Sequence, residues 1–411
     1  MKLLFIASGY LPYTFSENLC NAKLVYALQQ HGWQIDVISR KYDGTVYSAK
    51  WMSPWLDLQP HTFEIDYPVG NCCQRIWDII SSAAQLKIFP VEGIRWIRHA
   101  LRKALALNRQ NHYDFLLTRS PPDISHLVGY FVKQQTGLPW IANWNDPALP
   151  IWPEPYTFRH SRLKQQLLMH YTEICLQAAD INTFPSEHLR QHFIANFPVL
   201  RDKRTSVVPH IALSEGILPK KQPVRKGKFR MCHSGNLSAE RNPENFFHAM
   251  RELVDEGVDK LQFDIMGHIN DYTRTLIQKY SLEDYVKCPG SYPYLEALEK
   301  MSSYDVLVLI EAILDKGIFF PSKLTDYAQL DKPILAVSPK SGFAADLLAK
   351  YGGGIHADNS DCQKIKAAVK KLYDVWQAND LSSRYSPKGM YGYFSANAVV
   401  EMYEKLLSTM R

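Results

Sequence analysis

The sequence has no long hydrophobic run. No stretch approaches the roughly 18 consecutive apolar residues that a membrane-spanning helix needs. The opening MKLLFIAS has one lysine and only five apolar residues between Lys2 and Ser8, which is too short for the apolar region of a signal peptide. We therefore expect a cytoplasmic protein, whose contact with a membrane, if it has one, is peripheral.

Patterns for metal binding and disulfide bonding are also missing. No C-x-x-C pair and no D-x-D pair of aspartates occurs, and the cysteines are not combined with a paired histidine spacing for zinc. We expect reduced thiols, no metal and no other cofactor. The odd set of seven cysteines stands at positions 20, 72, 73, 175, 232, 288 and 362.

Neither sign of charge dominates the chain. The 47 basic and 41 acidic residues give a net charge of +6, which fits an anionic small molecule or an anionic lipid surface as well as nucleic acid. Because the basic residues do not gather with aromatic residues into one surface, we do not expect a nucleic-acid partner. The length of 411 residues favours two domains with a core each.

The chain shows an alternation of apolar strands and helical patterns twice. Residues 2–8 form a short apolar run that ends at a glycine, and a helical pattern at 19–31 and the strand IDVIS follow. The same order restarts at FRMCHSGN (229–236) with a second glycine turn. Such apolar runs are typical of parallel strands, so the pattern predicts an α/β protein with two Rossmann-like domains. Further strands are expected at 113–118, 139–144, 178–184 and 205–210, and in the second half at LQFDIMG, YDVLVLI and KPILAV.

Composition suggests where the domains end. We expect an N-terminal domain over 1–211, a linker rich in proline and lysine over 212–228 and a C-terminal domain over 229–385. The last segment, 386–411, has apolar residues three and four apart, and we expect this helix to cross back to the first domain.

A basic amphipathic stretch at 94–109 permits two interpretations. Its apolar residues, with Trp96 among them, line one helical face, beside a stripe of arginines at 95, 98, 102 and 109. The stretch can dock on an anionic membrane or admit a lipid-linked acceptor. Alternatively, its apolar face packs on the first sheet and its arginines are solvated.

Five segments together resemble the GT-B glycosyltransferases of family 4. They are GYLP (9–12), SPPD (120–123), PWIANWNDP (139–147), SGNLSAERNPENF (234–246) and FFPSKLTDYAQLDKPILAV (319–337). The resemblance covers essentially the whole chain and implies two Rossmann-like domains that face each other across a cleft. It also implies a retaining, metal-independent transfer of a hexosyl group from a nucleotide-diphosphate sugar to an acceptor hydroxyl. The commonest setting of such enzymes is the synthesis of cell-surface polysaccharides.

The resemblance places the donor on the second domain. Arg241 and Lys323 are the expected cationic ligands of its diphosphate, and Ser322 lies beside it at the start of a helix. Gly235 allows the backbone to approach the phosphates closely. The other expected donor contacts are Asn236, Gly267, Leu324, Gly290 and Ser291, the last two in a loop beside the nucleobase.

The chain departs from the family at one pair of positions. Relatives typically carry two glutamates with seven residues between them, the first beside the sugar and the second beside the ribose. Here the positions hold Ile318 and Asp326. Asp326 can still bind ribose hydroxyls, whereas Ile318 cannot bind the sugar, and we expect Glu311 to substitute for it.

On the first domain, the resemblance suggests an acceptor site. Asp146 either contacts the transferred sugar and the acceptor proton or forms a turn before Pro147. Gly9, Glu17 and Asn18 are the expected acceptor contacts. Two other functions remain open: a nucleotide-sugar epimerase of the same fold, and a nucleotide-sugar-binding module without catalysis.

Overall fold

The computed structural model describes residues 1–12, 15–41, 59–67, 72–89, 91–157, 160–224 and 226–410. The chain forms two compact units, which are treated separately below. Unit 1 comprises Met1–Trp152, Thr157–Pro209 and Val399–Arg411, and unit 2 comprises Pro153–Tyr156 and His210–Ala398.

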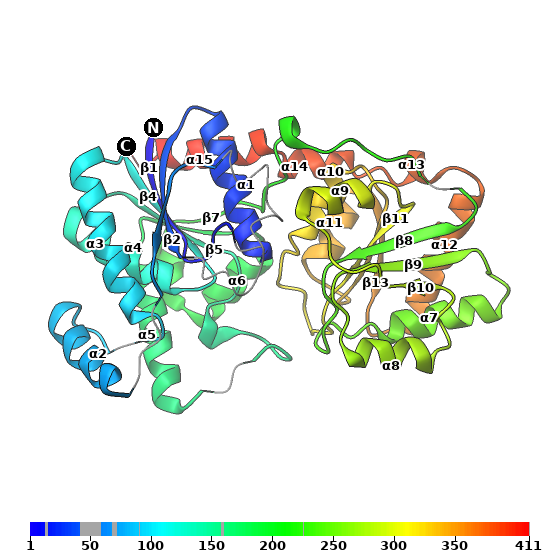
Figure 1. The fold of residues 1–411 in the computed structure, drawn as a ribbon, viewed down its shortest axis with the longest axis horizontal. Helices are drawn as coiled ribbons and strands as arrows, with labels where there is room; N and C mark the ends of the chain where they lie inside the picture. The colour runs from blue at the N-terminus through cyan, green and yellow to red at the C-terminus, as the bar shows by residue number, and fades with distance from the viewer. Residues whose placement is uncertain are drawn as a thin grey trace. The chain divides into compact units, whose positions relative to one another are not determined.

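Unit 1 contains a parallel sheet with helices on both faces (Figure 1). Its seven strands are ordered β3-β2-β1-β4-β5-β6-β7. They are β1 (Lys2–Ile6), β2 (Gln34–Arg40), β3 (Thr62–Ile65), β4 (Phe115–Ser120), β5 (Trp140–Trp144), β6 (Ile181–Phe184) and β7 (Thr205–Val207). The helices are α1 (Ser16–Gln30), α2 (Cys72–Gln85), α3 (Ile94–Asn111), α4 (Ile124–Thr136), α5 (Arg162–Ala178), α6 (Glu187–Asn196) and most of α15 (Ala396–Ser408).

Unit 2 contains a second parallel sheet, with the order β10-β9-β8-β11-β12-β13. Its strands are β8 (Phe229–Ser234), β9 (Leu261–Met266), β10 (Val286–Lys287), β11 (Val306–Ile310), β12 (Ile334–Ser338) and β13 (Gly354–Asp358). Its helices are α7 (Glu244–Asp255), α8 (Asp271–Lys279), α9 (Tyr294–Met301), α10 (Lys323–Gln329), α11 (Phe343–Tyr351), α12 (Cys362–Gln377), α13 (Leu381–Arg384) and α14 (Lys388–Phe394). The predicted α/β class with two Rossmann-like sheets is therefore confirmed.

The strand orders show where each sheet can bind a ligand. In unit 1 the chain runs outward on both sides of β1, and in unit 2 it does so on both sides of β8. Open parallel sheets bind ligands at such points, beyond the carboxyl ends of the strands. The loops that begin at Gly9 and Gly235 follow these two strands.

The proline- and lysine-rich stretch predicted as a linker packs on unit 2 over its first part. Ala212 and Leu213 are fully buried, and the Leu213 N–H donates to the side chain of Gln329 at 3.0 Å. Further along, the Gln222 N–H donates to the Ser302 hydroxyl at 2.7 Å. Position 225 lies outside the described residues.

The apolar stripe of helix α3 is buried and is not available for membrane docking. Ile94, Trp96, Ile97 and Leu101 are all buried in unit 1, so the interpretation of this face as a lipid contact is wrong. The alternative interpretation, a packed apolar face with solvated arginines, holds for part of the stripe. The arginines at 102 and 109 are exposed. Arg95 and Arg98 instead bind a carboxylate on α2. No described helix is both long and apolar enough to cross a membrane.

Candidate functional site

Two glycines bring bare backbone together at the end of β8. Gly235 has a φ of +123° and donates its N–H to the Met266 carbonyl at 2.8 Å. A Cβ on Gly267 would lie 2.3 Å from the carbonyl oxygen of Gly235. Asn236 extends this turn, since its side-chain oxygen accepts the N–H of His268 at 2.9 Å. Only glycine fits this close approach, so the loops after β8 and β9 pack backbone to backbone.

The side chain of Lys323 lies against this glycine turn. A Cβ on Gly235 would be 2.7 Å from both Cε and Nζ of Lys323. The ammonium lies 3.4 Å from Nε2 of His233. Nδ1 of this histidine lies 3.0 Å from the Val308 carbonyl; because that carbonyl can only accept, Nδ1 carries the proton and Nε2 presents a lone pair to the lysine. Burial, reinforced by the Lys323 charge, holds the pKa of His233 well below its usual range.

Three of the residues expected in the donor site influence one another electrostatically. Burial lowers the pKa of Lys323 to about 7; the charge of Arg241 adds to the lowering and Glu311 opposes it. Burial raises the pKa of Glu311 to about 7 against the opposing charges of Arg241 and Lys323. Glu311 is 8% exposed and directly follows β11. The structure thus gathers Arg241, Lys323 and Glu311 into one charged cluster beside the glycine turn.

The start of α10 is held in place by a buried tyrosine. The Tyr327 hydroxyl accepts the N–H of Ser234 and donates to the Val308 carbonyl, both at 3.2 Å. The N–H groups of Leu324 and Thr325 already donate to carbonyls at positions 321 and 322, and Leu324 is fully buried. An anion at this end would therefore meet Ser322 and Lys323. Leu324 contributes packing instead of the expected donor contact.

Asp326 connects α10 to the loop expected beside the nucleobase. Its Oδ1 accepts the hydroxyl of Tyr294 at 2.7 Å, and Tyr294 begins α9 directly after the loop that contains Gly290 and Ser291. Both loop residues are partly exposed. Ile318 is buried, which agrees with an apolar residue at the family's first glutamate position.

Tyr156 is an additional aromatic residue in this part of unit 2. Its ring packs edge-on against Phe319 with 5.6 Å between the centroids. Burial raises the pKa of Tyr156, and the neighbouring guanidinium of Arg241, to which it is hydrogen-bonded, opposes this. Tyr156 therefore orients the exposed side chain of Arg241.

The residues expected in the acceptor site of unit 1 fall into two groups. Glu17 lies near Asp146 and binds Asn145 and Arg119, the latter at 3.5 Å. Burial raises the pKa of Glu17 to about 8, Arg119 opposes the rise and Asp146 adds to it. Burial also raises the pKa of Asp123 to about 6. Glu17 therefore keeps its proton at neutral pH, and Glu17 and Asp123 both lie near Asp146.

Gly9 and Asn18 instead stabilise the turn after β1. The Asn18 amide donates to the Tyr10 carbonyl at 2.9 Å, and a Cβ on Gly9 would lie 2.6 Å from Oδ1 of Asn18. Asn18 is only 4% exposed. It therefore has a structural role in place of the expected contact with acceptor hydroxyls.

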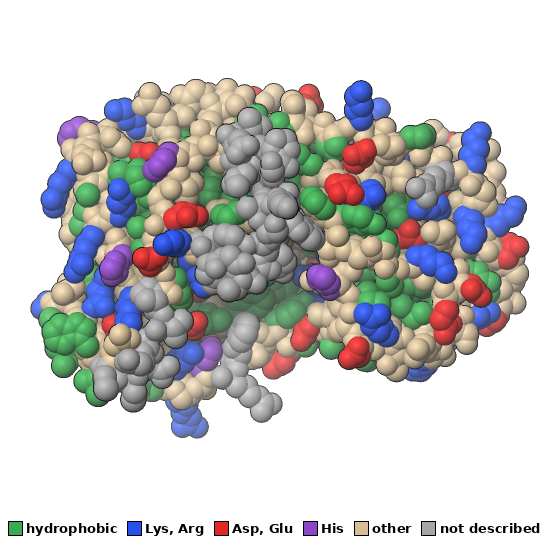
Figure 2. All heavy atoms as spheres, viewed as in Figure 1, with side chains coloured by type: hydrophobic (Ala, Val, Ile, Leu, Met, Phe, Trp, Pro, Cys, Tyr) green, Lys and Arg blue, Asp and Glu red, His purple; other side chains and the backbone are tan. Residues whose placement is uncertain are grey.

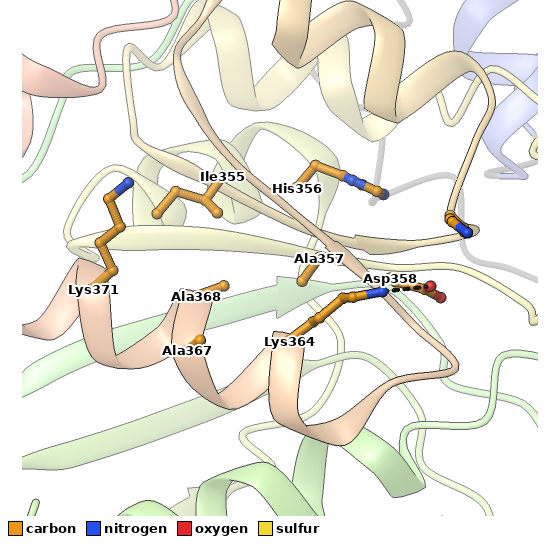
Figure 3. A pocket seen from close by; sticks show the side chains of 9 residues that line it. Ile355, His356, Ala357, Asp358, Lys364, Ala367, Ala368 and Lys371 are labelled. Atoms are coloured by element: carbon orange, nitrogen blue, oxygen red, sulfur yellow. Dashed lines mark hydrogen bonds and ion pairs between the residues drawn. The ribbon is translucent and has the colours of Figure 1, made fainter.

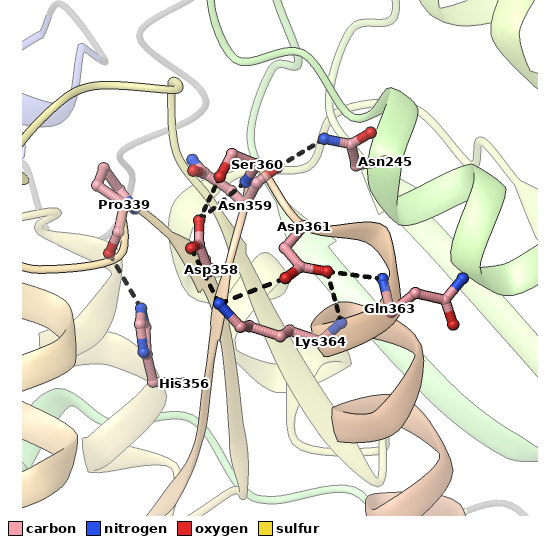
Figure 4. Close-up of polar contacts among 9 residues, drawn as sticks. All are labelled: Asn245, Pro339, His356, Asp358, Asn359, Ser360, Asp361, Gln363 and Lys364. Atoms are coloured by element: carbon pink, nitrogen blue, oxygen red, sulfur yellow. Dashed lines mark hydrogen bonds and ion pairs between the residues drawn. The ribbon is translucent and has the colours of Figure 1, made fainter.

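An open pocket of about 450 Å³ lies elsewhere on unit 2, between β13 and α12 (Figure 3). Lys364 lines it and pairs with Asp358 at 3.5 Å and Asp361 at 3.3 Å (Figures 3 and 4). At the end of the same strand, the Asn359 amide donates to the carbonyls of Glu311 and Ala312 at 3.1 and 2.9 Å. None of the predicted site residues lines the pocket, but the network beside it supports the backbone of Glu311.

Sequence reasoning missed His233, Tyr327 and Tyr156. A histidine inside the apolar run FRMCHS was a usable signal, because a buried histidine requires hydrogen-bonding partners. Tyr327 follows Lys323 by four residues, one helical turn, and this spacing predicts that the two side chains point to the same side of the helix. The sequence around Tyr156 offers no comparable signal.

Solved structures share this architecture along the whole chain. Sucrose-phosphate synthase from Thermosynechococcus elongatus is 13% identical and has a TM-score of 0.73; the match covers 100% of this chain and 98% of that one. HepE from Anabaena in complex with UDP-glucose is 14% identical, with a TM-score of 0.68 and 100% of both chains covered. WaaG, a glycosyltransferase involved in lipopolysaccharide biosynthesis, is 11% identical, with a TM-score of 0.61 and 95% of each chain covered. The fold is that of the GT-B glycosyltransferases, as the sequence predicted.

A family model refines this assignment for unit 2. Residues 215–388 match the model described as glycosyl transferases group 1. The matched region contains the glycine turn and the charged cluster of Arg241, Glu311 and Lys323. The fold and the matched region are therefore both similar to those of glycosyltransferases. No curated protein matches the chain in sequence.

Proposed function

We propose that this protein transfers a hexosyl group from a nucleotide-diphosphate sugar, bound by unit 2, to the hydroxyl of an acceptor bound by unit 1. The observation that carries the proposal is the position of Lys323 against Gly235, with Arg241 and Glu311 in the same cluster. Bare backbone next to two cationic side chains is suited to a diphosphate. UDP and UDP-glucose bound to HepE, which has the same fold, support a donor of this class.

The cluster can stabilise the leaving group. As the bond from the sugar to the diphosphate breaks, negative charge grows on the diphosphate oxygens, and the charges of Arg241 and Lys323 oppose it. Because two side chains supply this positive charge, we propose that transfer needs no metal ion. Asp326 would bind the ribose and Glu311 a sugar hydroxyl, the role that Ile318 cannot fill.

Unit 1 would supply the acceptor side. Asp146 lies near Glu17, and because Glu17 keeps its proton at neutral pH, the Asp146 carboxylate would accept the proton of the attacking hydroxyl. We propose a retaining outcome and a role in the synthesis of cell-surface polysaccharide or glycoconjugate in the cytoplasm. These proposals rest on the family resemblance. A lipid-linked acceptor is one candidate.

Thermal unfolding tests the donor site directly. The protein is heated with UDP-, GDP-, CMP- and dTDP-sugars in the presence of EDTA, and a ligand that binds only the folded state raises the melting temperature. We expect one nucleotide class to stabilise the wild type but not Arg241→Ala or Lys323→Ala. Two exposed cations of unit 2 provide matched controls, Arg274→Ala and Lys260→Ala, which should keep the full shift.

Product analysis separates the proposed activity from its alternatives. Wild-type protein with the stabilising donor should release the nucleoside diphosphate and, with acceptor, give a glycoside whose anomeric configuration NMR assigns. Conversion of the donor into an epimer without release of nucleotide would establish the epimerase instead. Binding without turnover of any donor would indicate a binding module.

A further inference from the structure

Helix α2 is oriented with its apolar face outward. Of the described side chains, five large hydrophobic ones within residues 76–89 are strongly exposed, at 43% to 65%. They are Ile76, Trp77, Ile79, Ile80 and Phe89. We call this set the α2 apolar surface. Figure 2 shows hydrophobic side chains gathered at the lower left of the view, where Figure 1 places α2.

The opposite face of α2 is polar and buried. Asp78 accepts from Arg95 at 3.0 Å and from Arg98 at 2.9 Å, and Arg98 also donates to Ser81. The carboxylate is 9% exposed and the two guanidinium groups 14% and 13%. A helix on a water-facing surface normally buries its apolar face. Here ion pairs fix the reverse orientation, which leaves contiguous apolar area in water unless something covers it.

Exposed lysines stand beside this surface, and Glu92 is the exposed carboxylate that follows Phe89 in the chain. Asp78 is the one acidic residue in the sequence of α2, and two arginines neutralise it. Lys87 is exposed two residues before Phe89. The Phe89 backbone is bound on both its N–H and its carbonyl by the hydroxyl of Tyr171 on α5. Lys164 stands seven residues before Tyr171, two helical turns away on the same side of α5, and it is exposed beside the 65% exposed Leu163.

We propose that the α2 apolar surface docks unit 1 on an anionic lipid bilayer. Large apolar and aromatic side chains would enter the headgroup boundary, while lysines at its rim contact anionic headgroups. A second copy of this chain is a poorer occupant, because both sides of the contact would carry the same exposed lysines. The inference concerns unit 1 alone and does not rest on the proposed function.

Vesicle sedimentation of the full chain tests the proposal. The probes are vesicles of phosphatidylcholine alone and of phosphatidylcholine mixed with phosphatidylglycerol. We expect binding that is stronger to the anionic vesicles and that falls about tenfold or more in Trp77→Ser combined with Ile80→Ser. Lys87→Glu with Lys164→Glu should reduce binding to the anionic vesicles only. Since all four side chains are exposed, the variants should keep the wild-type melting temperature.

Matched substitutions on unit 2 provide the control. Val224→Ser with Tyr272→Ser removes two exposed apolar side chains from the other unit and should leave vesicle binding unchanged. Equal binding by the α2 variant and the wild type would overturn the proposal, as would no binding by the wild type. A wild-type dimer that becomes a monomer in the α2 variant, without vesicle binding, would assign the surface to self-association instead.

Discussion

The ammonium of Lys323 lies 3.4 Å from Nε2 of His233, whose Nδ1 is bound to the Val308 carbonyl. The histidine is therefore fixed as a neutral acceptor, and it holds the lysine at the glycine turn. The hydroxyl of Tyr327 donates to the same Val308 carbonyl. Strand β11 therefore positions both His233 and helix α10, which carries Lys323.

Filling the space beside Gly235 should displace Lys323. In Gly235→Ala the new Cβ would meet Cε and Nζ of Lys323 at 2.7 Å, so we expect donor affinity to fall about tenfold or more, as calorimetric titration can measure. Gly257→Ala is the matched control, because it also has a positive φ but nothing within 4 Å of its Cβ. Both variants should lose about 1 kcal/mol of stability from backbone strain. Equal loss of affinity in the two would contradict the assigned position of Lys323.

Donor affinity should fall as pH rises through neutrality. The pKa of Lys323 is about 7, so the free protein loses this positive charge above pH 7, while Glu311 gains a negative charge in the same range. Both changes weaken the attraction for a diphosphate, and the loss should approach about tenfold per pH unit for Lys323 alone. Calorimetry between about pH 6 and about pH 8 measures the slope.

Lys323→Arg separates the two contributions to this slope. Arginine stays protonated over the range, so the variant should keep only the part that comes from Glu311. Glu311→Gln should remove that part and keep the lysine's. A slope unchanged in both variants would mean that other groups control the pH dependence.

The stability of unit 1 should depend on Glu17. Burial raises its pKa from 4.5 to about 8, so the folded protein retains a proton that the unfolded chain releases. Stability is therefore lost as pH rises from about 4.5 to 8. Glu17→Gln cannot ionise, and we expect its melting temperature to fall less than that of the wild type over this range. Glu401→Gln, an exposed residue of the same unit, should behave as wild type; identical profiles for all three proteins would show that Glu17 ionises freely in the folded state.

Asp78 should stabilise the orientation of α2. Asp78→Asn leaves Arg95 and Arg98 without their charged partner in a largely buried position, and we expect a loss of about 2 kcal/mol in the free energy of unfolding. Denaturant unfolding measures it. Replacing the exposed Asp66, which pairs with Lys41, by asparagine should cost little, because surface ion pairs contribute about 0 to 1 kcal/mol. Similar losses in both variants would mean that the buried pairs are not important for stability.

Local sequence patterns were sufficient to predict much of this protein. The apolar runs KLLFI and VLVLI are buried strands because nothing polar interrupts them, and a glycine marks the turn after β8. The cationic candidates Arg241 and Lys323 lie within contiguous motifs, so their chemistry could be inferred without the fold. Their predicted proximity required only that β8 and β11 be neighbours in a parallel sheet.

Only the tertiary structure decided which faces are buried. The stretch at 94–109 has the sequence of a membrane-docking helix, yet its apolar face lies in the core, while α2 exposes its own. The ion pairs of Asp78 with Arg95 and Arg98 determine that orientation. The partners are 17 and 20 positions apart and lie on different helices, so the sequence of either helix alone does not reveal the pairs. The raised pKa values of Glu17 and Glu311 likewise depend on burial in the folded protein. The sequence therefore determines the elements and the candidate chemistry, whereas long-range packing determines exposure and charge.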